Sequence, residues 1–216
     1  MSAQEAILPI ARHVATAYNQ GGPQKERSRG HSNVPADPAQ LEARGPEIAA
    51  EFQRQGVTRI ISSDLPRAAD TAKFVGEQMG VPVELSRRLR TWDTGEMAGK
   101  LEKETLPLRK KYIRFSDTQP KGGEEFDAFF DRFSTELNKW VRHNQGHPDD
   151  PVGLILHGHE VMSLEQAISG GEVKPAQLDT LDELYPPGSV ILLRINGDPP
   201  RHVKIERVHP ELPQAG

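Results

Sequence analysis

Short apolar runs alternate with amphipathic segments along most of this chain, and this alternation limits its possible folds more than any other feature. Short apolar or alternating runs are typical of strands, whereas apolar residues three and four positions apart are typical of helices. Five or six runs read as strands: Ile7–Ala11, Thr58–Ser62, Val81–Leu85, Val152–Leu156, Ser189–Arg194 and His202–Val208. Helical spacing is found in Pro38–Gln55, Pro66–Met79, Glu125–His143 and Glu160–Ile168. The sequence therefore predicts an α/β fold, a three-layer α/β/α sandwich around a mostly parallel, mixed sheet of about six strands.

The length of 216 residues favours one domain over residues 1–216, with two small domains as the alternative. Proline (18) and glycine (19) are abundant enough to favour long loops around the core. Two such loops, residues 20–36 and 116–123, are expected to lie over a functional site. The tail at residues 210–216 is expected to be frayed.

The composition argues against several classes of protein. A net charge of −4 provides no broad cationic surface for nucleic acid, so any anion must be bound locally. No run approaches the roughly 18 apolar residues of a membrane span, and the first residues lack the basic start of a secretory signal peptide. Cysteine is absent, which excludes disulfides and thiolate chemistry. We therefore expect a soluble cytoplasmic protein with no nucleic-acid or membrane partner.

Arginine and histidine residues follow three of the predicted strands. Arg12 and His13 come directly after the first strand, and His157 follows a later, fully apolar one. Arg67 lies in the first turn of the helix after the second strand, where free backbone N–H groups and the helix dipole favour phosphate. Each residue alone is as readily a structural or solvated one. However, ligands of open α/β sheets bind beyond the carboxyl ends of strands, so the four residues together predict an anion site at one sheet edge.

The segments around these residues resemble the motifs of the histidine phosphatase superfamily, the phosphoglycerate-mutase-like proteins. Arg12-His-Val-Ala-Thr-Ala-Tyr-Asn19 is similar to the family's Arg-His-Gly-x-Thr-x-x-Asn signature. The stretch at 62–72 is similar to Ser-x-Leu-x-Arg-Ala-x-x-Thr-Ala, and His157-Gly158 to the second His-Gly. Two further segments resemble the family less closely. Residues 41–45 are similar to its Leu-Thr-x-x-Gly motif. Residues 122–125, followed by Phe129 and Arg132, are similar to its Gly-Gly-Glu-Ser segment and the helix after it. Together the resemblance spans about residues 7–195.

The resemblance implies a histidine acid-type phosphatase that hydrolyses phosphate monoesters without a metal ion or other cofactor. His13 would attack phosphorus and form a phosphohistidine, which water then hydrolyses. Arg12 and Arg67 would hold the phosphoryl oxygens, and His157 would donate a hydrogen bond to one of them. The implied partner is a small phosphorylated substrate or a phosphoprotein. Further candidates for substrate contact are Thr16, Asn19, Glu124 and Gly158.

The sequence departs from the family at the position of the proton donor. The family's Leu-x-Glu-x-x-x-Gly segment corresponds to residues 89–95, which places Thr91 where the family has glutamate. Threonine is a poor acid, so we expect Asp93 to protonate the leaving alkoxide, unless Asp93 is a turn residue. Glu96 is the spare candidate and Glu124 a weaker one.

A second departure keeps other functions open. Val14 replaces the family's glycine, and its branched side chain is expected to narrow the pocket floor or to lower the activity. The alternatives are a cofactor-dependent phosphoglycerate mutase and a catalytically weak module that binds phosphate or phosphoproteins. A metal site built on His157 and His159 is a third reading, although no further cluster with metal-ligand spacing accompanies the pair.

Overall fold

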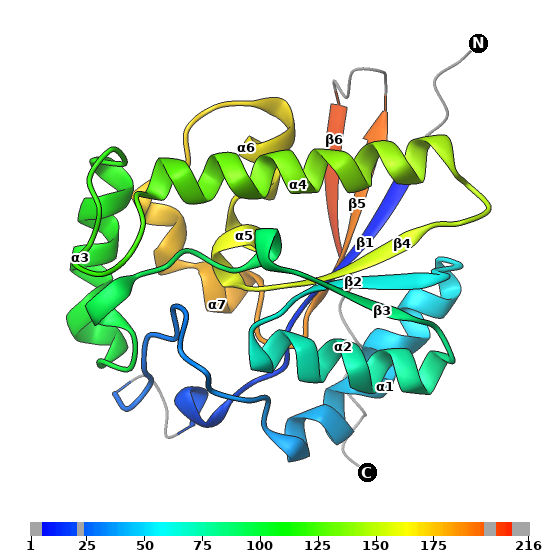
Figure 1. The fold of residues 1–216 in the computed structure, drawn as a ribbon, viewed down its shortest axis with the longest axis horizontal. Coiled ribbons are helices and arrows are strands. Elements are labelled where there is room, and N and C mark those ends of the chain that lie inside the picture. Colours follow the sequence, from blue (N-terminus) through cyan, green and yellow to red (C-terminus); the bar gives the residue numbers. More distant parts are fainter. Residues whose placement is uncertain (1–5, 21–23, 197–201, 209–216) are drawn as a thin grey trace.

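The fold is built around one mixed sheet, seen in the computed structural model, which describes residues 6–20, 24–196 and 202–208 (Figure 1). Within these ranges six strands pair in the order β3-β2-β4-β1-β5-β6. The strands are β1 (Ala6–Arg12), β2 (Arg59–Ser63), β3 (Val83–Ser86), β4 (Val152–Leu156), β5 (Val190–Asn196) and β6 (His202–Val208). The pairs β1–β4, β2–β4 and β2–β3 are parallel, whereas β1–β5 and β5–β6 are antiparallel. This confirms the predicted mixed, mostly parallel sheet.

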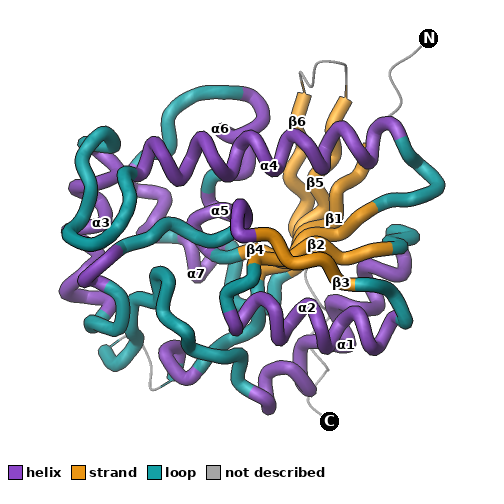
Figure 2. The backbone as a smooth tube through the Cα atoms, in the orientation of Figure 1, coloured by secondary structure: helices purple, strands orange, loops and turns teal. Residues whose placement is uncertain are grey.

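Helices cover both faces of the sheet. The longer ones are α1 (Pro38–Arg54), α2 (Pro66–Met79), α3 (Glu102–Arg114) and α4 (Phe126–Gly146). The shorter ones are α5 (Gly158–Met162), α6 (Leu164–Ser169) and α7 (Leu181–Leu184), with 3₁₀ turns η1 (Ala17–Asn19), η2 (Arg87–Leu89), η3 (Gly95–Met97) and η4 (Pro175–Asp179). In Figures 1 and 2, α1 and α2 lie on one side of the sheet and α4 and α6 on the other. The three layers that the sequence predicts are therefore present.

The central strands are apolar throughout because both of their faces are covered. In β4, Leu154 and Leu156 belong to the buried cluster beneath α4, whereas Ile155 belongs to the cluster beneath α1 and α2. This alternation follows from the two-residue period of a strand. The side of α4 that faces the sheet contributes Phe129 and Phe133, which are both fully buried. Burial on both sides fixes the register of the central strands and thus the positions of their carboxyl ends.

Most predicted elements are observed, and the differences have local causes. The helix predicted at 160–168 is split into α5 and α6 at Ser163, whose hydroxyl donates to the carbonyl oxygen of His159 (2.7 Å). The strand predicted from Val81 begins after Pro82, which lacks a backbone N–H. Helices α3 and α7 were not predicted, because α3 contains Pro107 and α7 has only four residues. The predicted frayed tail lies outside the described residues.

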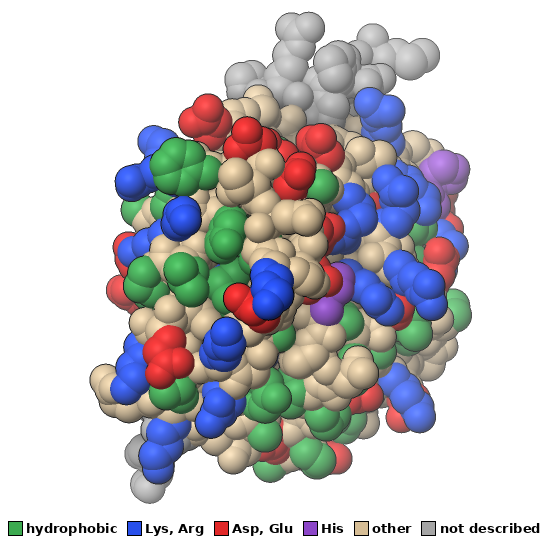
Figure 3. Space-filling view, turned by 60° about the vertical axis from the view of Figure 1, so that its left-hand side comes forward, with side chains coloured by type: hydrophobic (Ala, Val, Ile, Leu, Met, Phe, Trp, Pro, Cys, Tyr) green, Lys and Arg blue, Asp and Glu red, His purple; other side chains and the backbone are tan. Residues whose placement is uncertain are grey.

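None of the helices in the described ranges is long and apolar enough to cross a lipid bilayer. On the face turned forward in Figure 3, Lys and Arg side chains are spread among Asp and Glu side chains. Hydrophobic side chains are scattered between them.

Candidate active site

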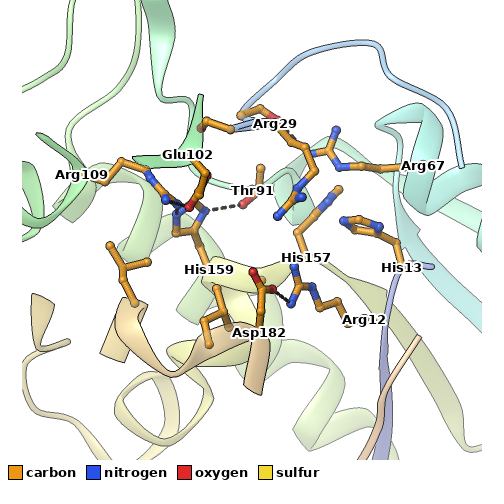
Figure 4. Close-up of a pocket in the computed structure, with 15 residues that line it drawn as sticks. Arg12, His13, Arg29, Arg67, Thr91, Glu102, Arg109, His157, His159 and Asp182 are labelled. Atoms are coloured by element: carbon orange, nitrogen blue, oxygen red, sulfur yellow. Dashed lines mark hydrogen bonds and ion pairs between the residues drawn. The ribbon is translucent and has the colours of Figure 1, made fainter. Parts of the chain in front are cut away.

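The four residues that the sequence places at strand ends lie around one pocket. Arg12 ends β1 and His13 follows it, Arg67 lies in the first turn of α2, and His157 follows β4. All four line a pocket with about 480 Å³ of empty space, its mouth included (Figure 4). The ring centroids of His13 and His157 are 5.1 Å apart. The predicted convergence at the carboxyl edge of the sheet is therefore what the structure shows.

His13 is held in a defined orientation. Its Nδ1 lies 2.6 Å from the carbonyl oxygen of Val14, which can only accept, so Nδ1 carries the proton and donates. The other ring nitrogen, Nε2, keeps a free lone pair. Burial, and then the charges of Arg67, Arg12 and Arg29, lower the pKa of His13 well below its ordinary value. The imidazole is therefore neutral near pH 7 and available as a nucleophile.

Arg67 is anchored so that one side of its guanidinium stays free. Its Nη2 donates to the carbonyl oxygen of Gly30 (2.8 Å), and its Nη1 donates to that of Ser32 (3.1 Å). Its Nε is buried without a hydrogen-bond partner in the protein. Burial, followed by the charge of Arg29, lowers the pKa of Arg67 to about 9, which still leaves it cationic at neutral pH. An anion bound between Arg67 and Arg29 would stabilise both positive charges.

Arg12 and His157 complete a set of unpartnered donors. One terminal nitrogen of Arg12 donates to Asp182 and to the carbonyl oxygen of Tyr185 (2.6 Å), while its Nε has no partner. Both ring nitrogens of His157 are buried and unpartnered as well. Burial lowers the pKa of His157 well below its usual value, and the charge of Arg67 lowers it further. Buried donors without partners are rare in folded proteins, so their concentration here indicates the binding site of an anion.

Among the other residues that line the pocket are five charged or imidazole side chains that the sequence analysis did not assign to it. Arg29 reaches toward the centre of the pocket, as Figure 4 shows. Arg109 and Glu102 form an ion pair at one end of it. His159 lies between Arg109 and Thr91, and Asp182 pairs with Arg12. These side chains are those of Arg29, Glu102, Arg109, His159 and Asp182. Arg29 belongs to the loop 20–36, which was expected over the site, whereas three of the others lie on α3 and α7, the helices that the sequence did not predict.

The loop at 20–36 contributes to the pocket, whereas the loop at 116–123 does not. Ser28, Arg29 and Gly30 line the pocket. None of the lining residues comes from 116–123, contrary to the expectation that this loop covers the site. Instead, the carbonyl oxygen of Lys121 accepts from the backbone N–H of Glu96 (3.0 Å), which packs this loop on the neighbouring turn.

Thr16 and Asn19 do not line the pocket but support the loop that carries Arg29. Asn19 closes a capping box with Thr16, and its amide donates to Glu26 Oε1 (2.8 Å). The same oxygen accepts from Arg29 Nη1 (3.0 Å). The two signature residues therefore act on the pocket indirectly, through Glu26.

Asp93 does not line the pocket, which differs from its predicted place as proton donor. One carboxylate oxygen of Asp93 accepts from the backbone N–H of Gly95 (3.0 Å), and the other lies 3.3 Å from His31. Glu124 lies outside the pocket too, where it accepts from the backbone N–H of Asp93 (3.0 Å) and from Arg132 (2.7 Å). These carboxylates hold the turn after Thr91 in place. Glu96 is also absent from the pocket lining.

Val14 and Gly158 are placed differently from one another. Val14 is fully buried in the core cluster beneath α1 and α2 and does not line the pocket, so the expected narrowing of the pocket floor is wrong. Gly158 does line it. A Cβ atom at Gly158 would lie 2.9 Å from Leu181 Cδ2 and 3.5 Å from the Arg12 guanidinium. A side chain at this position would therefore have to displace Leu181 and would press on Arg12.

His157 and His159 gain no metal-ligating partners in the part of the chain that the structure describes. No group of three or more His, Cys, Asp or Glu side chains there is placed to hold a metal ion. His159 instead contacts Thr91 and Arg109, and burial, followed by the charge of Arg109, lowers its pKa well below the ordinary value.

Comparison with known proteins adds to this geometry. The model of a family described as the histidine phosphatase superfamily (branch 1) matches residues 8–207. A glucosyl-3-phosphoglycerate phosphatase of Mycolicibacterium vanbaalenii is 31% identical over 173 residues, which cover 76% of this chain and 74% of that protein. Phosphoglycerate mutase-like protein 4 of Arabidopsis thaliana is 28% identical over 166 residues, 74% of this chain and 69% of that protein.

A solved structure agrees in fold. The mycobacterial glucosyl-3-phosphoglycerate phosphatase in complex with VO3 superimposes with a TM-score of 0.72. The superposition covers 94% of this chain and 98% of that one, at 24% sequence identity. The α/β arrangement seen here is thus that of phosphoglycerate-mutase-like structures.

Proposed function

This chain belongs to the histidine phosphatase superfamily, branch 1, and on that basis we propose that it hydrolyses phosphate monoesters through a phosphohistidine formed on His13. The observation that carries the proposal is the set of buried, unpartnered donors on Arg12, Arg67 and His157 around one pocket. A phosphoryl group would supply the oxygen acceptors that these donors lack, together with a negative charge that balances the arginines.

The first step is the attack of His13 on phosphorus. The hydrogen bond from Nδ1 to Val14 leaves the lone pair of Nε2 free to attack. Burial and the neighbouring cations keep the ring neutral before the substrate binds, so no base has to remove a proton first. The N–P bond forms as the P–O bond to the alcohol breaks.

Arginines, and not a metal ion, would neutralise the transferring group. Arg12 and Arg67 present free Nε–H donors, and Arg29 adds a third positive charge at the pocket centre. His157, whose ring centroid lies 5.1 Å from that of His13, would donate a hydrogen bond to a phosphoryl oxygen. In phosphoryl transfer such positioning and charge stabilisation supply most of the rate enhancement. Water then attacks the phosphohistidine and releases phosphate.

The proposed substrate is a small phosphorylated molecule. The M. vanbaalenii relative is named for a phosphatase acting on glucosyl-3-phosphoglycerate, a small substrate of this kind. Because this relative acts on a small molecule, small phosphomonoesters rank above phosphoproteins as the proposed substrate.

A phosphoglycerate mutase is the second candidate, favoured by the similarity to phosphoglycerate mutase-like protein 4. A mutase returns the phosphoryl group from His13 to a second hydroxyl and needs a bisphosphate to phosphorylate the enzyme. Turnover that begins only after a bisphosphate is added would support the mutase. Release of inorganic phosphate from the first turnover, without any primer, supports the phosphatase.

The test is to trap the phosphoenzyme. Rapid mixing with p-nitrophenyl phosphate is expected to yield one acid-labile phosphate per chain in the wild type and none in His13→Ala. His147→Ala is the matched control, because His147 is exposed and far from the pocket lining. If no acid-labile phosphoprotein forms and His13→Ala releases nitrophenolate as fast as the wild type, neither the phosphatase nor the mutase mechanism on His13 survives. A phosphate-binding module remains if neither protein exceeds the uncatalysed rate.

A further inference from the structure

Glu160 is a buried carboxyl group that the reaction above does not use. It lies in α5, three residues after His157, and is 0% exposed. Neither of its carboxyl oxygens has a hydrogen-bond partner of normal geometry, and none of the ion pairs among the described residues includes it. A carboxylate in such a place is costly, so this group is expected to hold a proton readily.

The surroundings of Glu160 tune it for proton exchange near neutral pH. Burial raises the pKa of Glu160 to about 7, against the opposing effects of its own backbone N–H and of the Thr91 hydroxyl. The positive charges of Arg132 and Arg67 also lower the pKa, by less than burial raises it. General acids work best when their pKa is close to the working pH.

Thr91 connects this carboxyl group with the pocket. It lines the pocket, and its hydroxyl lies 3.1 Å from Nδ1 of His159, the residue that precedes Glu160 in α5. Arg109 Nη1 lies 3.4 Å from His159 Nε2 and can only donate, so Nε2 accepts and Nδ1 carries the ring proton. His159 therefore donates to the Thr91 oxygen, and the hydroxyl proton of Thr91 is free to be donated elsewhere.

Thr91 also lies where the leaving oxygen is expected. Phosphoryl transfer proceeds in line, with the leaving group opposite the nucleophile. In Figure 4, His13 and Arg67 lie on one side of the pocket and Thr91 and His159 on the other, with His157 between them. An attack from His13 therefore directs the leaving oxygen toward Thr91.

Other carboxyl groups near the pocket are engaged. Glu102 is paired with Arg109, and Asp182 with Arg12. Asp93 does not line the pocket. Glu160 differs from them in being free of ion pairs.

We propose that Glu160 supplies the proton for the leaving alcohol and that the hydroxyl of Thr91 relays it. The inference rests on the phosphatase reaction proposed above. As the P–O bond breaks, its electron pair stays on the leaving oxygen, which takes the hydroxyl proton of Thr91. At the same time the Thr91 oxygen takes the proton of Glu160, so the alcohol leaves neutral and Glu160 becomes a carboxylate. When water attacks the phosphohistidine, a proton returns by the same route, and Glu160 is restored.

The reaction of substrates with different leaving groups tests this relay. An alkyl phosphate needs a proton on its leaving oxygen, whereas nitrophenolate leaves without one. Glu160→Gln is expected to reduce kcat with an alkyl phosphate by about 100-fold, the usual size of general acid catalysis, and with p-nitrophenyl phosphate by less than about 5-fold. Thr91→Val should reproduce this split, while Thr91→Ser, which keeps a hydroxyl, should not. Partial recovery in Glu160→Asp would support a proton-transfer role.

The pH profile adds a readout that a merely structural role would not change. With the alkyl phosphate, the wild-type rate should fall as the pH rises above about 7, because Glu160 loses its proton. This basic limb should be absent in Glu160→Gln. Equal losses on both substrates, or an unchanged limb, would overturn the relay. If Glu160→Gln does not fold, the Thr91 pair decides the question by the same split.

The two proposals fail in different ways. If the wild type forms no phosphohistidine when it is mixed with p-nitrophenyl phosphate, the proposed function itself is wrong. With phosphohistidine present but no dependence on the leaving group in either variant, only the proton relay is wrong.

Discussion

The carboxylate of Glu26 holds Arg29 by an ion pair of 3.0 Å, and the same oxygen accepts from the amide of Asn19 (2.8 Å). The signature asparagine thus positions an arginine ten residues further along the chain. After burial, the charge of Arg29 helps to lower the pKa values of His13, Arg67 and Arg109. We therefore expect Arg29 to act as a third guanidinium that binds the substrate.

Arg29→Gln is therefore expected to weaken substrate binding. Loss of a charge-assisted hydrogen bond to phosphate costs roughly 1.5–3 kcal/mol, so kcat/KM should fall about 10- to 100-fold. Arg27→Gln is the matched control, since Arg27 lies in the same loop but bonds to the carbonyl oxygen of Gly99 outside the pocket (2.7 Å). Steady-state kinetics and inhibition by inorganic phosphate measure the effect. Equal kinetics of the two variants would remove Arg29 from the site.

Gly158→Ala is expected to displace the guanidinium of Arg12 from its position in the pocket. The added methyl group would press on Leu181 at 2.9 Å and on the guanidinium at 3.5 Å. We expect inhibition by phosphate to weaken by about 10-fold, which corresponds to about 1.4 kcal/mol. Gly146→Ala is the control, because a Cβ atom there meets nothing within 4 Å. The double variant with Leu181→Ala should recover part of the loss, and no recovery would contradict the steric explanation.

Val14→Gly tests where the valine acts. Because Val14 is fully buried in the core and not in the pocket, its loss should lower the free energy of unfolding by about 1–3 kcal/mol. The shape of the pocket should change little, because Val14 does not line it, so kcat is expected to stay within about 3-fold of the wild type. Chemical denaturation and steady-state kinetics provide the two measurements. A large rise in activity at unchanged stability would restore the view that Val14 obstructs the site.

Stability should fall as the solution is acidified. Burial lowers the pKa values of His13, His157 and His159 in the folded state, while in the unfolded chain they remain near 6.5. Below about pH 6.5 the unfolded state binds more protons, so each histidine costs up to about 1.4 kcal/mol of stability per pH unit. Above that pH the cost disappears. Glu160 works in the opposite direction, but it is one group against three.

Thermal unfolding at pH 7.5 and 5.5 measures this dependence. The unfolding midpoint should drop on acidification, and His159→Gln should make the drop smaller. His147→Ala, at an exposed position, should leave it unchanged. A midpoint that is independent of pH in the wild type would show that the three rings are not buried as neutral groups.

Glu160→Gln should change stability in a way that depends on pH with the opposite sign. Burial raises the pKa of Glu160 from about 4.5 to about 7, so the folded state binds the extra proton between these values. The stabilisation by this proton is fully present below pH 4.5 and is lost as the pH rises through 7. By pH 8 the wild type therefore loses up to about 3 kcal/mol that the neutral glutamine does not lose. Denaturant unfolding of both proteins at pH 5 and pH 8 checks this, and a constant difference would contradict it.

The strand-and-helix pattern and the residues at the strand ends could be predicted from the sequence, because both depend on local spacing. The bounds of α2 are those predicted, and β1 and β4 deliver Arg12, His13 and His157 to one edge as expected. A strand that is apolar on both faces lies in the interior of such a sheet, so the residue that follows it lies at the carboxyl edge where ligands bind.

The remainder of the pocket was decided by tertiary contacts that leave no local signal. Arg12 and Asp182 are separated by 170 residues, and Arg109 and His159 by 50. Asp93 follows Thr91 closely in sequence, yet its turn directs it away from the pocket, whereas Glu160 comes close to Thr91 from another element. Local periodicity determines which face a residue occupies within its own helix or strand. Only the packing of separate elements determines which distant side chain shares its surroundings, and hence which carboxyl group keeps a proton.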